Sequence, residues 1–205
     1  MAVTEEDLGR RERKKRETRR ALEQAALRLA TERGPEHVTV EEIADAVDVS
    51  VRTFFNYFSS KEEAIVGGDN DASFLVDRLR IRPASEPPMV ALRHVFVEVF
   101  GAAGEGWADR RLIRHRLVRQ HPSLLPRHLA AHHVLERDLR RALEERLGLA
   151  PDSSLYPALV VTTAVNAMRL VVTSWDATGR TVPLVSVLEE AFVSLEHGLP
   201  LPEDA

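Results

Sequence analysis

The sequence predicts an all-α protein of about nine helices. Signals for strands are almost absent, because the chain has no long run that alternates apolar and polar residues and no Asn-Gly or Asp-Gly hairpin turn. Apolar residues recur instead at the three- and four-residue spacing of a helix face. With 205 residues, the chain is long enough for one large or two small domains with a buried core.

The composition is that of an ordinary soluble protein, with 44% hydrophobic and 29% charged residues. The absence of cysteine excludes disulfides, thiolate metal sites and cysteine nucleophiles. The N-terminus is charged rather than apolar, which argues against a secretory signal, so we expect a cytoplasmic protein.

The first expected helix is basic at its start and ends near residue 33, where Gly34 and Pro35 interrupt the pattern. Residues 10–20 hold eight basic side chains against two acidic ones, although the whole chain has a net charge of -4. Such an arm suits contacts with phosphates, but a solvated helix face or a disordered tail would have the same composition. The apolar stripe of this helix is Leu22, Ala25, Ala26 and Leu29, and its basic stripe is Arg13, Arg16 and Arg20.

Two capping boxes mark the starts of further helices. Thr39 with Glu42 predicts a second helix from about residue 40, and Ser60 with Glu63 predicts a fourth helix from Lys61.

Between these boxes, Ser50 is the expected N-cap of a third helix that runs to about Tyr57. Gly67 and Gly68 follow soon after the start of the fourth helix. They either kink this helix or end it in a loop, and we place the boundary between two domains here, at 10–62 and 63–200.

Five more helices follow from the apolar spacing, at 92–100, 107–120, 125–147, 155–175 and 184–195. The helix at 155–175 is apolar and about long enough to cross a membrane. Its proline, asparagine, arginine and threonines make it a poor span, so we expect a helix buried inside the protein or a dimer, and no membrane.

The second and third helices have the parts of a helix-turn-helix, namely two short helices, a tight turn and a small apolar core. Val49, Phe54 and Phe58 can pack inward. The alternative is an aromatic-rich core helix, but four aromatics within residues 54–58 cannot all face one core on a helical period.

The side chains left on the outer face of the third helix suit the edges of DNA bases. Arg52 is expected to pair with guanine, and Thr53 or Val51 to contact a thymine methyl group. Thr39 and Lys61 stand at helix N-termini, where a phosphate can bind.

Two runs in this region are distinctive: Thr-Val-Glu-Glu-Ile-Ala-Asp-Ala-Val at 39–47 and Val-Ser-Val-Arg-Thr-Phe-Phe-Asn-Tyr-Phe-Ser-Ser-Lys-Glu-Glu at 49–63. Together with the basic first helix and Gly34, they resemble the TetR family of bacterial transcriptional regulators over roughly residues 15–65. Phe55 departs from the family, which often has tyrosine there, and so lacks a hydroxyl for a phosphate.

The resemblance implies an N-terminal three-helix helix-turn-helix domain that binds double-stranded DNA, and a C-terminal helical domain for ligand binding and dimerisation. It implies a homodimer through 155–178 and 183–197, which would place two reading helices about one DNA turn apart on a near-palindromic operator. The expected DNA contacts are Arg13, Arg16, Arg20, Thr39, Ser50, Val51, Arg52, Thr53, Asn56, Tyr57 and Lys61.

A small-molecule effector would lie between the middle helices, and its candidate contacts are Phe96, Phe100, Trp107, Leu117, Asn166, Met168, Arg169 and Trp175. Arg169 is notable because a buried guanidinium needs an acidic partner, a group of carbonyls or an anionic ligand. An internal ion pair or an interface arginine is the alternative. The basic run at 110–119 either holds a phosphate-bearing ligand such as an acyl-CoA or forms a solvated face.

Catalytic and metal-binding patterns are weak. His128 and His132 have a spacing that can bind zinc, but no acidic or thiol partner stands at a suitable distance, so we expect no metal. The chain has no glycine-rich phosphate loop and no nucleophile elbow, so we expect no enzyme and no cofactor.

The sequence and the resemblance thus predict a ligand-responsive transcriptional regulator, a repressor that a small, largely apolar ligand releases from a near-palindromic operator. An acyl-CoA-like molecule is one candidate for this ligand. The alternative is a helical ligand- or partner-binding module without sequence-specific DNA binding. The acidic net charge and Phe55 favour that alternative.

Overall fold

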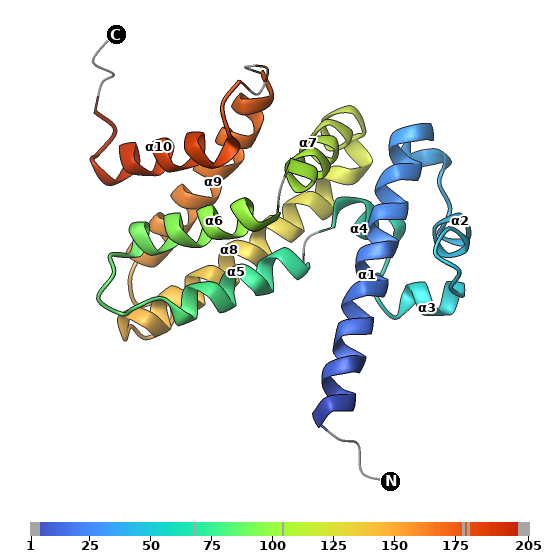
Figure 1. Ribbon diagram of the computed structural model, residues 1–205, viewed down its shortest axis with the longest axis horizontal. Helices are drawn as coiled ribbons and strands as arrows, with labels where there is room; N and C mark the ends of the chain where they lie inside the picture. Colours follow the sequence, from blue (N-terminus) through green and yellow to red (C-terminus); the bar gives the residue numbers. More distant parts are fainter. Residues whose placement is uncertain (1–4, 68, 104, 178, 180, 201–205) are drawn as a thin grey trace. The chain divides into compact units, whose positions relative to one another are not determined.

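The computed structural model describes residues 5–67, 69–103, 105–177, 179 and 181–200, and in this part of the chain it is all helical (Figure 1). The predicted fold class is therefore confirmed. The α-helices are α1 (Glu5–Arg33), α2 (Val40–Asp45), α3 (Val51–Phe55), α4 (Lys61–Val66), α5 (Asp69–Ile81), α6 (Pro88–Ala103), α7 (Glu105–Gln120), α8 (Leu125–Leu147), α9 (Tyr156–Ala177) and α10 (Leu184–Glu196), with short 3-10 helices η1 (Pro35–His37) and η2 (Pro122–Leu124).

The chain forms two compact units. The N-terminal unit is Met1–Asn70 together with Ile113–Ala131, and the C-terminal unit is Asp71–Leu112 together with His132–Ala205. Helices α7 and α8 therefore each contribute residues to both units. The functional division at 62/63 stays a prediction.

The N-terminal unit is built around the apolar face of α1. Leu22 and Ala26 are fully buried there, and Ile43 and Phe54 bring α2 and α3 onto the same core. Ala44 is also fully buried, which allows the backbones of the two short helices to approach closely. This core fixes how α3 is presented to solvent.

The C-terminal unit has its own core, in which α6, α9 and α10 pack against one another. Phe96 on α6 is stacked on Phe100, with ring centroids 5.6 Å apart, and lies 5.7 Å from the ring of Phe192 on α10. The apolar spacing read from the sequence therefore identifies faces that are in fact buried.

The structure decides one open alternative and differs from two local expectations. Of the kink and the end that the sequence allows in the fourth helix, the structure has the end, because Gly67 has a φ of 65° and follows Val66, the last residue of α4. This break raises the count from the expected nine to ten α-helices among the described residues. The third helix ends at Phe55, two residues earlier than expected.

The second difference concerns the capping box predicted at Ser60 and Glu63, of which only half forms. The Ser60 hydroxyl accepts the Glu63 amide at 3.2 Å, as expected of an N-cap. The Glu63 carboxylate instead accepts from the amide and hydroxyl of Ser59. Glu63 thus gains two bonds from one serine, whereas the reciprocal bond of a capping box would give it only the Ser60 amide.

Helix α9 is the one helix of the described chain that is long and apolar enough to cross a membrane, with a mean hydropathy of 1.3 over its best window. This criterion considers only the length and the composition of a helix, and a helix in the core of a folded domain also satisfies it. Nine residues of α9 are buried in the C-terminal unit. The helix thus has the burial pattern of a core helix.

Candidate nucleic-acid interface

The α2–α3 turn is fixed by local hydrogen bonds. At the start of α2, the Thr39 hydroxyl accepts the Glu42 amide and the Glu42 carboxylate accepts the Thr39 amide, so the predicted capping box is present. After α2, the chain turns through Asp48, which has a φ of 56°, and the Val49 amide donates to the Ala44 carbonyl at 3.0 Å. The turn therefore delivers Ser50 to a defined position.

Ser50 then starts α3 as predicted. Its hydroxyl accepts the Thr53 amide at 3.0 Å and lies 2.8 Å from the Thr53 hydroxyl. Because each hydroxyl can donate as well as accept, both remain able to bond to DNA after a small rotation.

The outer face of α3 combines charge, amide and aromatic groups. Arg52, Phe55 and Asn56 are exposed and share one face at three- and four-residue spacing. Phe54 and Phe58 are buried, whereas Phe55 leaves 54% of its surface open to solvent. The aromatic cluster is therefore divided between core and surface, which agrees with the helical-period argument against a purely internal helix.

The remaining predicted contacts differ in exposure. Arg13, Arg16 and Arg20 are exposed on α1, and Thr39 is exposed at the start of α2. Val51, Thr53, Tyr57 and Lys61 are half-buried.

Lys61 has a structural task inside the N-terminal unit. Its ammonium donates to the carbonyls of Pro35 and Val38, both at 2.8 Å, and so ties η1 to the start of α4. An ammonium has three N–H donors, so these bonds use two of them. A phosphate contact by Lys61 stays a prediction, since it would have to use the third donor or displace a carbonyl.

Hydrogen bonds and nearby positive groups lower the pKa of two carboxylates in this unit. The Thr39 amide and the Arg33 guanidinium lower the pKa of Glu42, with Arg33 Nη1 2.8 Å from Glu42 Oε1. The pKa of Glu36 is also lowered, first by a backbone amide and then by His121, whose Nδ1 lies 2.8 Å from Glu36 Oε1. The bonds that close the cap at the start of α2 therefore favour the ionised form of Glu42.

Sequence reasoning missed a buried charged group in the same unit, formed by Arg19, Glu23 and Arg114. The four-residue spacing of Arg19 and Glu23 could have suggested a pair on one helix. Nothing in the sequence indicates that Arg114, 91 positions later, reaches the same carboxylate.

Comparison with known proteins identifies both ends of the chain. The model for bacterial regulatory proteins of the tetR family matches residues 23–64, and a model described as the MftR C-terminal domain matches residues 86–200. The HTH-type transcriptional regulator TcmR of Streptomyces glaucescens is 36% identical over 174 residues, which cover 82% of this chain and 76% of TcmR. The chain belongs to the TetR family. It is accordingly a transcriptional regulator with a helix-turn-helix and a ligand-binding domain.

Two solved structures of the TetR-like fold cover most of the chain. One is Thermus thermophilus FadR, a TetR-family transcriptional repressor in complex with lauroyl-CoA, with 26% identity and a TM-score of 0.51 over 90% of this chain and 96% of FadR. The other is the fatty acid degradation regulator FadR of Bacillus halodurans, with 19% identity and a TM-score of 0.54 over 89% of this chain and 96% of that one. At 19% identity, the second similarity supports the fold alone.

The residues predicted to contact an effector do not all lie together. Phe96, Phe100, Met168 and Trp175 belong to the core of the C-terminal unit. Leu117 belongs instead to the core of the N-terminal unit. The side chain of Trp107 lies outside those that the structure describes.

Arg169 differs from its expected environment. It is exposed in the chain, and its Nη2 donates to Asn166 Oδ1 at 3.1 Å, while the Asn166 amide donates to the Thr162 carbonyl. Arg169 is therefore not buried in the single chain, and its predicted roles, as a contact for an anionic ligand or as an interface arginine, stay predictions. Most residues of α9 are apolar, so the composition of the helix suggests burial on all sides. The few polar residues, among them Arg169, lie instead on a narrow face that is exposed in the chain.

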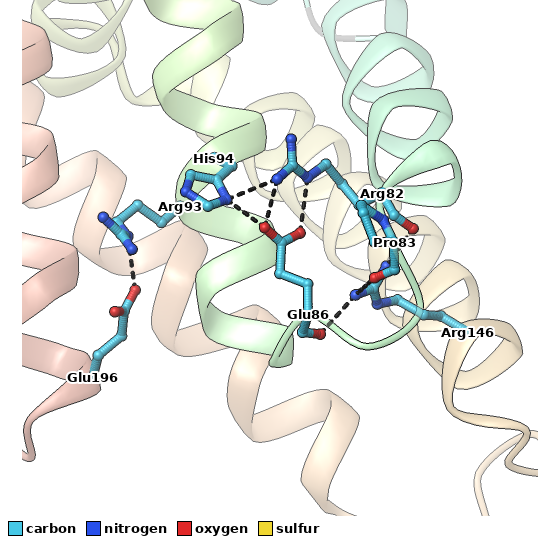
Figure 2. Close-up of polar contacts among 7 residues, drawn as sticks. All are labelled: Arg82, Pro83, Glu86, Arg93, His94, Arg146 and Glu196. Carbon is cyan, nitrogen blue, oxygen red and sulfur yellow. Dashed lines mark hydrogen bonds and ion pairs between the residues drawn. The ribbon is translucent and has the colours of Figure 1, made fainter.

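A polar cluster that sequence reasoning also missed holds the connection between α5 and α6 (Figure 2). The Glu86 carboxylate accepts from Nε and Nη2 of Arg82, and the ring Nδ1 of His94 lies 2.5 Å from Glu86 Oε1. The Arg82 and His94 contacts lower the pKa of Glu86 to about 2. Arg146 of α8 donates to the carbonyls of Arg82, Pro83 and Glu86, so the cluster fastens the connection to α8.

Proposed function

We propose that this TetR-family regulator is a cytoplasmic homodimeric repressor that leaves a near-palindromic operator when a small, largely apolar effector binds. The observation that carries the proposal is the outer face of α3, where Arg52 and Asn56 are exposed beside the Ser50–Thr53 cap. Arginine and asparagine side chains recognise guanine and adenine through paired hydrogen bonds in the major groove.

The basic face of α1 supports the same proposal. Arg13, Arg16 and Arg20 are exposed there and would contact the phosphate backbone. Phosphate contacts position a reading helix without selecting a sequence. Binding should therefore weaken steeply with salt, whereas sequence preference should depend on α3.

A second copy of the chain would cover the exposed apolar side chains of the last two helices. Leu159 and Leu170 on α9 are 55% and 59% exposed, and Val193 on α10 is 38% exposed. Apolar surface of this kind is buried favourably at a two-fold interface. The predicted segments 155–178 and 183–197 hold all three residues, and the dimer would engage two half-sites of one operator.

An acyl-CoA-like effector fits the apolar character of the C-terminal unit. Phe96, Phe100 and Met168 lie in one core, where an acyl chain would find aromatic and thioether surfaces. FadR of Thermus thermophilus, a relative of the same family, is known in complex with lauroyl-CoA. Lauroyl-CoA is therefore the first effector to test.

The test begins with selection of a DNA duplex from a random-sequence pool by the full-length protein, followed by a gel-shift titration at two salt concentrations. We expect a two-fold symmetric sequence, saturable binding and a loss of affinity with salt. Addition of lauroyl-CoA should then release the duplex, with coenzyme A alone as the control. Failure to enrich any sequence would reject DNA reading and favour the alternative of a ligand- or partner-binding module.

A further inference from the structure

Glu23 is an acidic side chain in the middle of the N-terminal unit. Only 9% of its surface is exposed, and it lies on the face of α1 that packs into the core. A carboxylate removed from water in this way is costly unless positive groups surround it. Two guanidinium groups do so, from Arg19 on the same helix and from Arg114 on α7.

Arg19 connects this carboxylate to the end of the recognition helix. Its Nε lies 3.2 Å from Glu23 Oε1, and its Nη1 donates to the Tyr57 carbonyl at 2.8 Å. The guanidinium also lies over the ring of Phe58, 4.4 Å from the ring centroid. Arg19 therefore holds the two residues that follow Asn56, the C-cap of α3.

Arg114 connects the same carboxylate to α7 and α4. Its Nη2 lies 3.9 Å from Glu23 Oε2, and its Nε donates to the Ile65 carbonyl in the last turn of α4. The guanidinium packs on Gly67, where a Cβ atom would lie 2.9 Å from Arg114 Nη2. Glycine at this position thus allows both the positive φ and the approach of the arginine.

The same helix that carries Arg114 also reaches the other unit. Residues 105–112 of α7 belong to the C-terminal unit, and residues 113–120 belong to the N-terminal unit. We propose that Arg114, Glu23 and Arg19 form a positioning relay through which α7 sets the orientation of α3 and thereby the affinity for DNA. The regulatory consequence rests on the proposed function, whereas the relay itself is a property of the N-terminal unit.

The relay works because Glu23 is shared. With Arg114 in place, two guanidinium groups face Glu23, and Arg19 also donates to the Tyr57 carbonyl. If α7 turns or slides so that Arg114 withdraws, the buried carboxylate loses one of these two guanidinium groups and attracts Arg19 more strongly. Its bond to the Tyr57 carbonyl then weakens, and the end of α3 is released from α1.

The experiment uses the two tyrosines of the chain as internal reporters. Tyr57 lies at the end of α3, and Tyr156 lies at the start of α9 in the C-terminal unit. The full-length protein is labelled with 3-fluorotyrosine, and the fluorine spectra of Arg114→Ala and Glu23→Gln are compared with that of the unchanged protein. Arg28→Ala is the matched control, because Arg28 pairs with Glu32 in the same unit but at the surface.

We expect both relay variants to shift the Tyr57 signal and leave the Tyr156 signal in place. Arg114→Lys retains the charge and should restore part of the shift, and Arg28→Ala should move neither signal. The affinity of unlabelled Arg114→Ala for the selected duplex should fall by about 2- to 30-fold. Glu23→Gln removes the charge that would draw Arg19 away from Tyr57, so its affinity should fall less than that of Arg114→Ala. If these residues only stabilised the fold, Arg114→Ala would lower the stability of the protein, but the folded protein would keep both its Tyr57 signal and its affinity for DNA.

An unmoved Tyr57 signal and unchanged DNA affinity in folded Arg114→Ala would overturn the relay. If circular dichroism shows that Arg114→Ala does not fold, the Tyr57 signal of Glu23→Gln decides, because this variant removes the shared charge and retains the shape of the side chain. An unmoved Tyr57 signal in folded Glu23→Gln would then overturn the relay. The Tyr57 shift requires neither DNA nor effector. It therefore supports the relay even where the unchanged protein selects no duplex, an outcome that would reject the proposed function alone.

Discussion

The two units of this TetR-family protein differ in how their sequences encode them. In the N-terminal unit, side-chain caps start three consecutive helices, α2, α3 and α4. In the C-terminal unit, α10 begins without a side-chain cap, and it is joined to α6 by a 2.8 Å bond from Arg93 to Glu196 across 103 positions. Local capping can be read along the chain, whereas distant pairing cannot.

This difference explains why the DNA-reading function is clear from the sequence and the effector is not. A reading helix needs a few polar side chains on one short helix, and their spacing is visible in the chain. An effector pocket is lined by apolar residues from several helices, and these look like any other core residues. Mutations that act on one unit at a time can test this contrast.

The largest effect is expected from Phe54→Ala, which removes a fully buried ring from the N-terminal core. The free energy of unfolding of that unit should fall by about 3–5 kcal/mol. Both tryptophans belong to the C-terminal unit, so circular dichroism should show an early transition that tryptophan fluorescence does not follow. Phe55→Ala is the matched control and should cost less than about 1 kcal/mol. Coincident transitions by both probes would contradict two separately stabilised units.

A smaller effect is expected from Glu86→Gln in the C-terminal unit. The folded-state pKa of Glu86, about 2, lies below its ordinary value of 4.5. Its contribution, on the order of 2 kcal/mol, is therefore complete above pH 4.5 and lost as the pH falls toward 2. Urea midpoints followed by tryptophan fluorescence should show the unchanged protein losing this advantage over the variant within that window.

Glu98→Gln is the control for this measurement, because Glu98 pairs with Arg78 in the same unit but is 44% exposed. Its urea midpoint should differ little from that of the unchanged protein at any pH. A pH profile for Glu86→Gln that runs parallel to that of the unchanged protein would exclude Glu86 as the source of the acid sensitivity.

The smallest effect is expected from Ser60→Ala, which removes the N-cap of α4. The loss should be about 1 kcal/mol in the N-terminal unit, seen as a lower midpoint in circular dichroism. Ser60→Asp retains a capping oxygen and should restore the midpoint. Equal midpoints for the alanine and aspartate variants would mean that the cap contributes nothing.

Most of the fold follows from the sequence, because caps, glycines and apolar spacing each act within a few residues. Gly67 is a position where the sequence alone does not decide the structure, because it allows either a kink or a loop. In the structure α4 ends there, and the side chain of Arg114 packs against the glycine. The exchange of Ser60 for Ser59 as the partner of Glu63 is likewise a choice between two close donors.

The candidate site divides in the same way. Exposure of Arg52 and Asn56 follows from the helical period, because the inward positions are taken by Phe54 and Phe58. The exposure of Arg169 cannot be predicted in this way, because nearly all of α9 is apolar and its sequence does not indicate which narrow face lies in solvent. The roles of Arg19, Glu23 and Arg114 depend on a contact between helices far apart in sequence, which no local pattern encodes.

Arg52→Ala tests most directly whether α3 reads DNA. The measurement is the dissociation constant for the selected duplex and for each symmetric single-base-pair change in it, with Arg141→Ala on the exposed face of α8 as the control. Arg52→Ala should lose about 1–3 kcal/mol of binding and its preference at one base pair of each half-site, while Arg141→Ala retains both. A uniform loss across all duplexes, with every base preference retained, would contradict base reading by α3.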